Sequence, residues 1–163
     1  YSGYSGQILV NDLPLHNMPA DNWRSGIAVF FAQEELFNGT LIENLTLGNT
    51  NISLEEIGET CKLVGLLPFV QSQMNGYFTT IDSQGQRLPN SVVQKILLAR
   101  CFLKKPNILM MENGWEIIES EYRQQIINKL INDKNFSLIA VSELGELSSG
   151  CDRTVRITEG KIK

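Results

Sequence analysis

Short apolar runs alternate with helical patterns throughout the second half of the chain. Ile108–Met111 and Leu138–Val141 are runs of four apolar residues, which is typical of buried strands. A helical pattern over Asn90–Lys104 precedes the first run, and a second one, which Ser120 can cap, extends to about Asp133. Strands that alternate with helices favour a mostly parallel sheet covered by helices on both faces. The sequence therefore predicts an α/β fold with a mostly parallel sheet flanked by helices.

The first half of the chain contains shorter elements. Ser53 and Glu56 have the spacing of a capping box, and Ile57, Cys61 and Val64 follow them on one helical face. The other predicted elements are strands at Gln7–Val10 and Ile27–Phe31, helices at Thr40–Leu45 and Leu67–Ser72, and a terminal hairpin made of Thr154–Thr158 and Lys161–Lys163. Because no repeat, linker or low-complexity tract separates them, we predict one domain over residues 1–163.

Charge and composition exclude several classes of function. The chain has 163 residues, of which 42% are apolar, as in an ordinary soluble globular protein. Its net charge of −4 gives no attraction to phosphate backbones, so we exclude nucleic acid as a partner. The apolar runs are too short to cross a bilayer. The three scattered cysteines, Cys61, Cys101 and Cys151, favour reduced thiols over a disulfide or a metal site.

Four collinear stretches resemble one known family, the nucleotide-binding (ATPase) domain of ABC transporters of the exporter type. They read SGQILVNDLPL, IAVFFAQEELFNGTLIENLTLGN, GYFTTIDSQGQRLPNSVVQKILLARCFLKKPNILMMENGWEIIES and LIAVSELGELSSGCDRTVRITEGKI. They are similar to the strand after the phosphate-loop helix, the Q-loop, the signature region with the acidic strand, and the switch-histidine strand with the closing hairpin. The resemblance implies an ABC ATPase-like fold, truncated at its N-terminus, with a helical signature subdomain at about residues 35–105.

The resemblance also implies a function. The family couples ATP binding to membrane transport and uses ATP and Mg²⁺ as cofactors. Its partners are a transmembrane domain and a second nucleotide-binding domain, identical or different, at the cytoplasmic face of the membrane. Gln33 matches the glutamine of the Q-loop, where together with Glu112 it would lie near the magnesium ion. The stretch LFNGTLIENL matches the surface on which the family docks its membrane coupling helices.

The phosphate-binding loop of the family does not occur in these 163 residues. That loop reads GxxxxGK[ST], and its amides and lysine hold the phosphates at a helix N-terminus. The only Gly-Lys pair, Gly160-Lys161, lies in the predicted terminal hairpin and lacks the other residues of the pattern. We therefore expect the chain to be a fragment of a longer polypeptide, the alternative being a protein that lacks the loop, and we expect it to bind no ATP alone.

Two catalytic positions are also altered. Asn113 falls on the general-base position, and an amide cannot accept a proton from water; the loss of a positioned base typically costs about 10²–10⁴ in rate. Glu143 falls on the switch-histidine position, where a carboxylate would repel the γ-phosphate. The only histidine, His16, lies far away near the N-terminus and is interpreted as a surface turn residue. We predict that hydrolysis is lost.

The signature loop of the family, LSGGQ, reads Leu88-Pro89-Asn90-Ser91-Val92. Pro89 removes a hydroxyl and an N–H, and the next two residues add side chains where the backbone must approach the partner's nucleotide. Ser91 can restore one hydroxyl contact, so we expect a weakened site. Glu119 replaces the aspartate of a later loop, and Asp82-Ser83 replaces a Gly-Glu pair. Trp115 either fills space that nucleotide would occupy or packs at a helix start.

Three hypotheses follow for the function. The first is a catalytically degenerate exporter domain that serves as a docking half. The second is an active transport ATPase whose phosphate loop lies upstream, and the third is a regulatory or interaction module on the same fold. Without the phosphate-loop strand, the strands Leu138–Val141 and Thr154–Thr158 would keep unpaired backbone groups. This predicts self-association or a distorted sheet at that edge.

Overall fold

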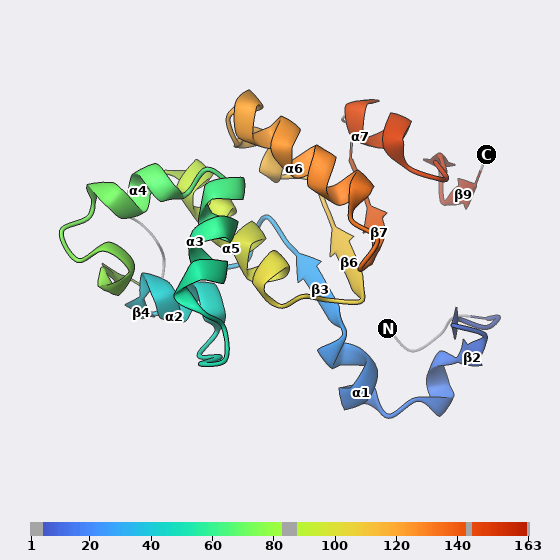
Figure 1. The fold of residues 1–163 in the computed structure, drawn as a ribbon. Coiled ribbons are helices and arrows are strands. Elements are labelled where there is room, and N and C mark those ends of the chain that lie inside the picture. The colour runs from blue at the N-terminus through green and yellow to red at the C-terminus, as the bar shows by residue number, and fades with distance from the viewer. Residues whose placement is uncertain (1–4, 83–87, 143–144, 163) are drawn as a thin grey trace.

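The computed structural model describes residues 5–82, 88–142 and 145–162. Three strands form a parallel sheet in the order β3–β6–β7: β3 (Ile27–Phe30), β6 (Ile108–Met111) and β7 (Ser137–Ala140) (Figure 1). Ile27 lies opposite Ile108, which lies opposite Ser137. The connections between these strands contain helices, as parallel strands require. The predicted α/β class is confirmed.

The two faces of this sheet differ in burial. Ala28 and Leu109 are neighbours on one face and are 4% and 0% exposed. On the other face Ile139 is 56% exposed, and Val141, which follows β7, is 66% exposed. Our expectation of a buried third strand is therefore wrong for the described residues, because Ser137 and Ile139 of β7 are exposed. The reason is that the core cluster, with the helices that contribute to it, packs against the first face only.

Helix α5 (Asn90–Leu103) runs through the centre of the molecule, and α6 (Ser120–Asn132) covers the sheet beside it (Figure 1). Ten residues of α5 are buried, and they include the polar side chains of Gln94, Lys95 and Arg100. The cap predicted for α6 is wrong: its N-cap is Glu119, which makes no side-chain capping bond, and Ser120 is already helical. The helix begins there because the preceding Ile118 is extended and buried.

A group of short helices lies on the other side of α5 from the sheet (Figure 1). It comprises β4 (Gly39–Thr40), α2 (Leu41–Thr46), α3 (Leu54–Leu63), α4 (Leu67–Ser72), the 3₁₀ turn η2 (Gly76–Phe78) and β5 (Thr80–Ile81). The capping box of Ser53 with Glu56 is present as predicted, and Ile57 on the predicted face is fully buried. β4 pairs with β5 and so joins the start of α2 to a segment about forty residues later.

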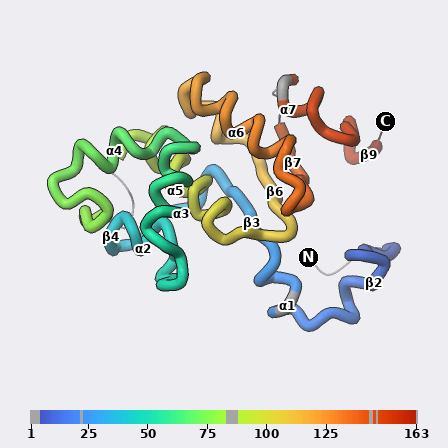
Figure 2. The backbone as a smooth tube through the Cα atoms, viewed as in Figure 1, coloured from blue at the N-terminus to red at the C-terminus, as the bar shows by residue number. Residues whose placement is uncertain are grey.

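Two small hairpins lie at the end of the molecule opposite α4 (Figure 2). The first pairs β1 (Leu9–Val10) with β2 (Leu13–Pro14), and the second pairs β8 (Ile157–Thr158) with β9 (Lys161–Ile162). The remaining elements are η1 (Leu15–Asn17), α1 (Ala20–Ser25), η3 (Trp115–Ile117) and α7 (Gly145–Gly150). His16 is exposed in η1, as predicted for a surface turn residue.

The outer edge of β7 carries no further strand among the described residues, since β8 pairs only with β9 there. Unpaired edges were predicted for these two segments, and the self-association that they favour stays a prediction. In the described part of the chain, every helix is too short or too polar to cross a bilayer.

Candidate functional site

A shallow depression of about 520 Å³ opens where β3 and β6 end, and it is lined by Phe31, Gln33, Glu34 and Glu112. The structure thus brings Gln33 and Glu112 together, although they are far apart in the sequence. The parallel register explains this, because Phe30 lies opposite Met111 and both chains leave the sheet at the same edge. Glu112 does not point freely into the depression, since its Oε1 accepts a hydrogen bond of 3.1 Å from the backbone N–H of Ala32.

Helix α5 supports the floor of this site through Gln94. Its Nε2 donates to the carbonyl of Ala32 at 2.8 Å and to Asn90 Oδ1 at 3.3 Å, while its buried Oε1 has no hydrogen-bond partner among the described residues. Gly114 packs against the same Ala32: a Cβ added at Gly114 would lie 2.1 Å from the Cβ of Ala32, and its φ is +128°. The two strand ends therefore meet in a close contact that only glycine allows.

Asn113, at the predicted general-base position, faces two acceptors. With its amide nitrogen directed toward them, Nδ2 donates to the carbonyl of Val141 at 2.9 Å and to Glu116 Oε1 at 3.3 Å. The other oxygen of Glu116 accepts from the backbone N–H of Gly114. Asn113 therefore acts as a donor that joins the ends of β6 and β7. The chemistry of an amide gives it no capacity to take a proton from water.

The predicted signature residues lie at the start of α5 and outside the lining of the depression. Pro89 is the N-cap residue with extended backbone and no side-chain capping bond, and its carbonyl accepts from the N–H groups of Val92 and Val93. Leu88 is half-buried, Asn90 is exposed, and Ser91 is half-buried at the first turn. Glu143, at the predicted switch position, lies outside the described residues.

The donor set of the depression suits a metal ion better than a triphosphate. Carboxylate and amide oxygens, as on Glu34, Glu112 and Gln33, are the ligands that Mg²⁺ prefers. The same lining contains no cation and no helix N-terminus that would hold phosphate oxygens. Within the described residues, no group of three or more acidic, histidine or cysteine side chains forms a metal cluster. The lining of this depression therefore does not fit ATP by itself.

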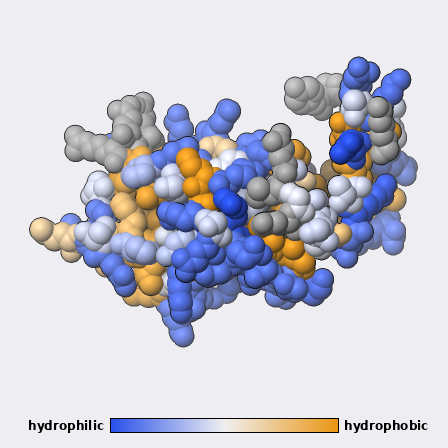
Figure 3. Space-filling view, turned by 90° about the horizontal axis from the view of Figure 1, so that it is seen from above, coloured by the Kyte–Doolittle hydropathy of each residue, from blue (hydrophilic) through white to orange (hydrophobic). Residues whose placement is uncertain are grey.

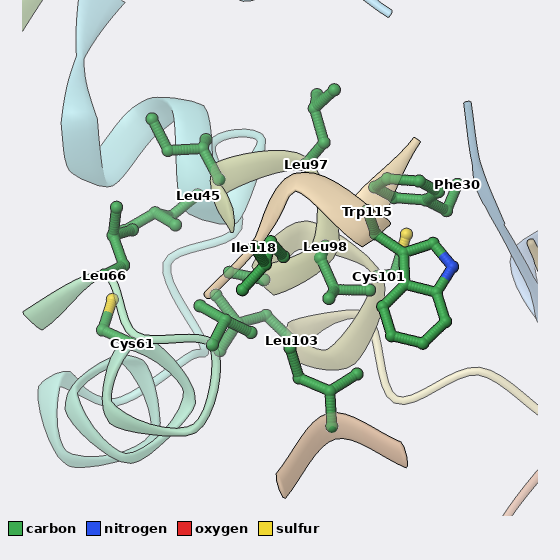
Figure 4. Close-up of a cluster of buried hydrophobic side chains, with 14 of the residues drawn as sticks. Phe30, Leu45, Cys61, Leu66, Leu97, Leu98, Cys101, Leu103, Trp115 and Ile118 are labelled. Atoms are coloured by element: carbon green, nitrogen blue, oxygen red, sulfur yellow. The ribbon is translucent and has the colours of Figure 1, made fainter. Parts of the chain in front are cut away.

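Trp115 follows this loop and is fully buried. Figure 4 shows it beside Phe30 and Cys101, between β3 and α5. Its Nε1 has no hydrogen-bond partner in the described part of the chain. The structure places Trp115 in the core at the start of η3, and the alternative that its ring fills space that nucleotide would occupy stays a prediction.

Arg100 connects α5 to the segment that follows Gln33. Arg100 is 7% exposed, and its guanidinium donates through Nε to the carbonyl of Asn44 at 2.5 Å and through Nη2 to Asn44 Oδ1 at 2.8 Å. Its Nη1 lies 3.3 Å from Glu34 Oε1, and the group also lies over the ring of Phe37. Burial lowers the pKa of Arg100, and the charge of Glu34 opposes that shift.

Lys95, one residue after Gln94, makes a second polar link between α5 and the site loops. Its Nζ lies 2.7 Å from Glu119 Oε2 and 5.2 Å from the centre of the Tyr122 ring. The hydrogen bond from Lys95 lowers the pKa of Glu119. Sequence reasoning missed Gln94, Lys95 and Arg100. A usable signal was present, because these polar residues interrupt the apolar pattern of a helix that is otherwise buried.

A larger cavity of about 800 Å³ lies at the opposite, amino-terminal end of the strands. It is bordered by α3, the end of α6 and the loop after α5, with Phe102 and Phe136 among its apolar lining. The ion pairs of Lys105 with Glu56 and of Lys129 with Asp133 lie at its rim. None of the predicted site residues that the structure describes lines it, so it is separate from the depression at the ends of β3 and β6.

Known proteins resemble this chain over its full length. It is 30% identical over 163 residues to a probable ABC transporter ATP-binding/permease protein of Haemophilus influenzae, covering 99% of this chain and 30% of that protein. It is 27% identical over 163 residues to an ATP-dependent lipid A-core flippase of Chromobacterium violaceum, covering 99% of this chain and 28% of that protein. The chain thus spans less than a third of the length of these relatives.

The fold has a solved counterpart. A bacterial Atm1-family ABC exporter with ATP bound matches 100% of this chain and 29% of its own, with a TM-score of 0.90 and 20% identity. No protein-family model matches the chain. The relatives match the sequence from end to end, and the solved exporter has the same arrangement of strands and helices. Over its whole length the chain is therefore similar to ABC exporter ATP-binding/permease proteins, and it has the fold of the solved exporter.

Proposed function

We propose that this chain is a catalytically degenerate nucleotide-binding domain that serves an ABC exporter as its docking half. In this role it contacts a transmembrane domain at the cytoplasmic face of the membrane and pairs with a second nucleotide-binding domain, which supplies the chemistry. The observation that carries the proposal is a contrast. The segment that would dock is held by a buried polar network, whereas the general-base position holds a hydrogen-bond donor.

The docking segment, residues 36–45, has its backbone held by hydrogen bonds, and exposed apolar side chains lie on it and in segments beside it. Asn44 is fully buried, accepts from Arg100 and from the N–H of Phe37, and donates to the carbonyls of Phe37 and Thr40. The β4–β5 pair attaches Phe78 to the same surface, since the N–H of Leu41 donates to the carbonyl of Thr79. Phe37, Leu47 and Phe78 are 40%, 61% and 65% exposed. Exposed apolar groups on a fixed backbone are typical of an interaction surface.

The face of the molecule drawn in Figure 3 shows apolar areas among hydrophilic ones. Exposed phenylalanines at the docking segment suit the apolar side of a short helix from a membrane protein better than they suit water. The alternative of an interaction module that has left transport would use the same surface for a soluble partner. Identifying the molecule that touches Phe37 therefore separates these two hypotheses.

The docking test uses a photo-crosslinking amino acid at Phe37 in the full chain, expressed in cells. We expect a covalent adduct that stays in the membrane fraction and contains a membrane-spanning segment. The matched control carries the same amino acid at Leu13, which is 58% exposed in the first hairpin, and should give no such adduct. Adducts with soluble proteins alone, or the same pattern from both positions, would refute the docking role.

The catalytic test compares the steady ATPase rate of the assembled exporter that contains the full chain and its partner domain with that of the same assembly carrying Glu112→Gln in this chain. If hydrolysis at this site is lost, the substitution leaves any measured rate unchanged, because that rate comes from a partner domain. A rate that Glu112→Gln abolishes would support the second hypothesis, an active ATPase. Glu121→Gln, at an exposed position of α6 outside the site, makes the same chemical change and controls for a lower amount of folded protein.

A further inference from the structure

In the loop after β6, Asn113 makes contacts that depend on its amide as a hydrogen-bond donor. Asn113 Nδ2 reaches the carbonyl of Val141 at 2.9 Å, and Val141 in turn donates its N–H to the carbonyl of Met111 at 2.8 Å. These two bonds link the carboxyl ends of β6 and β7 just beyond the last paired residues. Because both groups that face the amide are acceptors, the side chain at position 113 must be a donor to bind them.

Glu116, the second acceptor, is held in place from two directions. The backbone N–H of Gly114 donates to one carboxylate oxygen, and Asn113 donates to the other at 3.3 Å. The backbone carbonyl of Glu116 accepts from Arg123 Nη1 at 2.8 Å, which ties the turn η3 to α6. The carboxylate of Glu116 therefore cannot turn away from position 113 without losing its hydrogen bonds to Gly114 and Asn113.

We infer that Asn113 and Glu116 form a clasp that excludes a carboxylate from position 113. A glutamate there would place a negative charge beside Glu116 and would meet the carbonyl of Val141 with another acceptor. Like charges and paired acceptors repel, so the new side chain turns away to solvent, and the ends of β6 and β7 lose their link. Asn113 is thus a positioning residue, and the charge of Glu116 disfavours an acidic side chain in its place.

The inference deepens the proposed function, because position 113 has catalytic meaning only if this is the general-base position of the family. Under that assignment, two residues, Asn113 and Glu116, together keep a general base from position 113. Restoring glutamate alone does not place a base, since Glu116 already occupies the environment that a base would need. Neutralising Glu116 at the same time removes the charge and supplies an amide that can donate to the new carboxylate.

A double-mutant cycle in the full chain tests the clasp through stability. We expect Asn113→Glu to lower the thermal midpoint by about 2–6 °C, the size of the loss of two hydrogen bonds in a domain of this length. Glu116→Gln keeps one acceptor oxygen and should lower it less. The double variant should recover at least half of the loss caused by Asn113→Glu, because the like-charge repulsion between positions 113 and 116 is then absent. Asn51→Glu, at an exposed asparagine, is the control for added charge.

Trp115 provides a local readout that a general loss of stability does not move. It is one of two tryptophans and is fully buried two residues after Asn113. In a Trp23→Phe background, opening of the clasp should shift the emission of Trp115 to longer wavelength under native conditions. We expect that shift for Asn113→Glu and its reversal in the double variant, with no shift for Asn51→Glu.

Two results would overturn the inference. One is an Asn113→Glu variant as stable as Asn51→Glu with unshifted emission. The other is a double variant that recovers neither stability nor emission. None of these measurements uses nucleotide, so they succeed or fail independently of the ATPase comparison that tests the proposed function.

Discussion

The two halves of helix α5 serve regions of opposite character. In the C-terminal half, Arg100 donates to Asn44 and pairs with Glu34, so a buried charge meets fixed partners within the chain. In the N-terminal half, Gln94 reaches Ala32 and Asn90 but leaves its Oε1 without a hydrogen-bond partner among the described residues. The first region shapes the docking segment, and the second supports the loops of the candidate catalytic site.

Under the proposed function, this difference explains how one fold can keep docking and lose chemistry. A docking surface needs a rigid backbone and exposed apolar groups, and the network around Asn44 supplies the rigidity. A catalytic site needs polar groups that remain available to a ligand. At the ends of β3 and β6, the carboxylate of Glu112 and the amide of Asn113 are instead used by the backbone of Ala32 and Val141.

The largest expected effect is on the docking side. Arg100→Met removes the charged group of a residue that is 7% exposed and leaves the carbonyl of Asn44 buried without its donor. We expect a loss of about 2–4 kcal/mol in the free energy of unfolding, measured by denaturant titration. Arg153→Met makes the same chemical change at an exposed position and should cost less than about 0.5 kcal/mol. Equal losses for the two variants would contradict the contrast between a buried, anchored charge and a solvated one.

Local patterns predicted the elements of the fold well. The segment Leu67–Ser72 is helical with those bounds, and Ser53 with Glu56 forms the predicted capping box of α3, because both features depend on neighbours a few residues away. The strand Ile108–Met111 also has its predicted bounds. The burial of the third strand was predicted wrongly: an apolar run at Leu138–Val141 does not reveal whether other elements cover both faces of the sheet there.

The candidate site was only partly predictable for a physical reason. The resemblance identified Gln33, Glu112 and Asn113, and the structure brings the first two together. What these side chains bind depends on partners that are far away in sequence, such as Ala32 for Glu112 and Val141 for Asn113. Such contacts arise from the strand register and leave no periodic signal in the sequence.

A smaller effect is expected where the two strand ends touch. Gly114→Ala places a Cβ 2.1 Å from that of Ala32 and also forces a side chain into a φ of +128°. We expect a loss of about 2–3 kcal/mol, somewhat less than for Arg100→Met, by the same titration. Gly48→Ala is the matched control: its φ is +78°, nothing lies within 4 Å of the added Cβ, and it should cost about 1 kcal/mol. Similar losses would show that the strand ends are not in tight contact.

The smallest effect concerns the ion pair that joins α5 to the loop before α6. The hydrogen bond from Lys95 lowers the pKa of Glu119 below its ordinary 4.5, so the pair stabilises the fold above that pH and is lost as the pH falls through the lowered pKa. Because Glu119 is 56% exposed, solvent screens the pair. We expect Glu119→Gln to cost about 0.5–1 kcal/mol at pH 7.

The pH dependence separates this pair from a general effect of lost charge. Protonated Glu119 is neutral like glutamine, so the difference in unfolding free energy between the parent and Glu119→Gln should shrink as the pH falls below about 4.5. Glu121→Gln, two residues later and exposed, is the control for the loss of a surface charge and should cost less than about 0.5 kcal/mol at pH 7. If the difference caused by Glu119→Gln stays the same at low pH, the ion pair of Lys95 with Glu119 does not stabilise the fold. The N-terminal half of α5 is then not linked to its loop by charge, and only Arg100, in the C-terminal half, makes such a link.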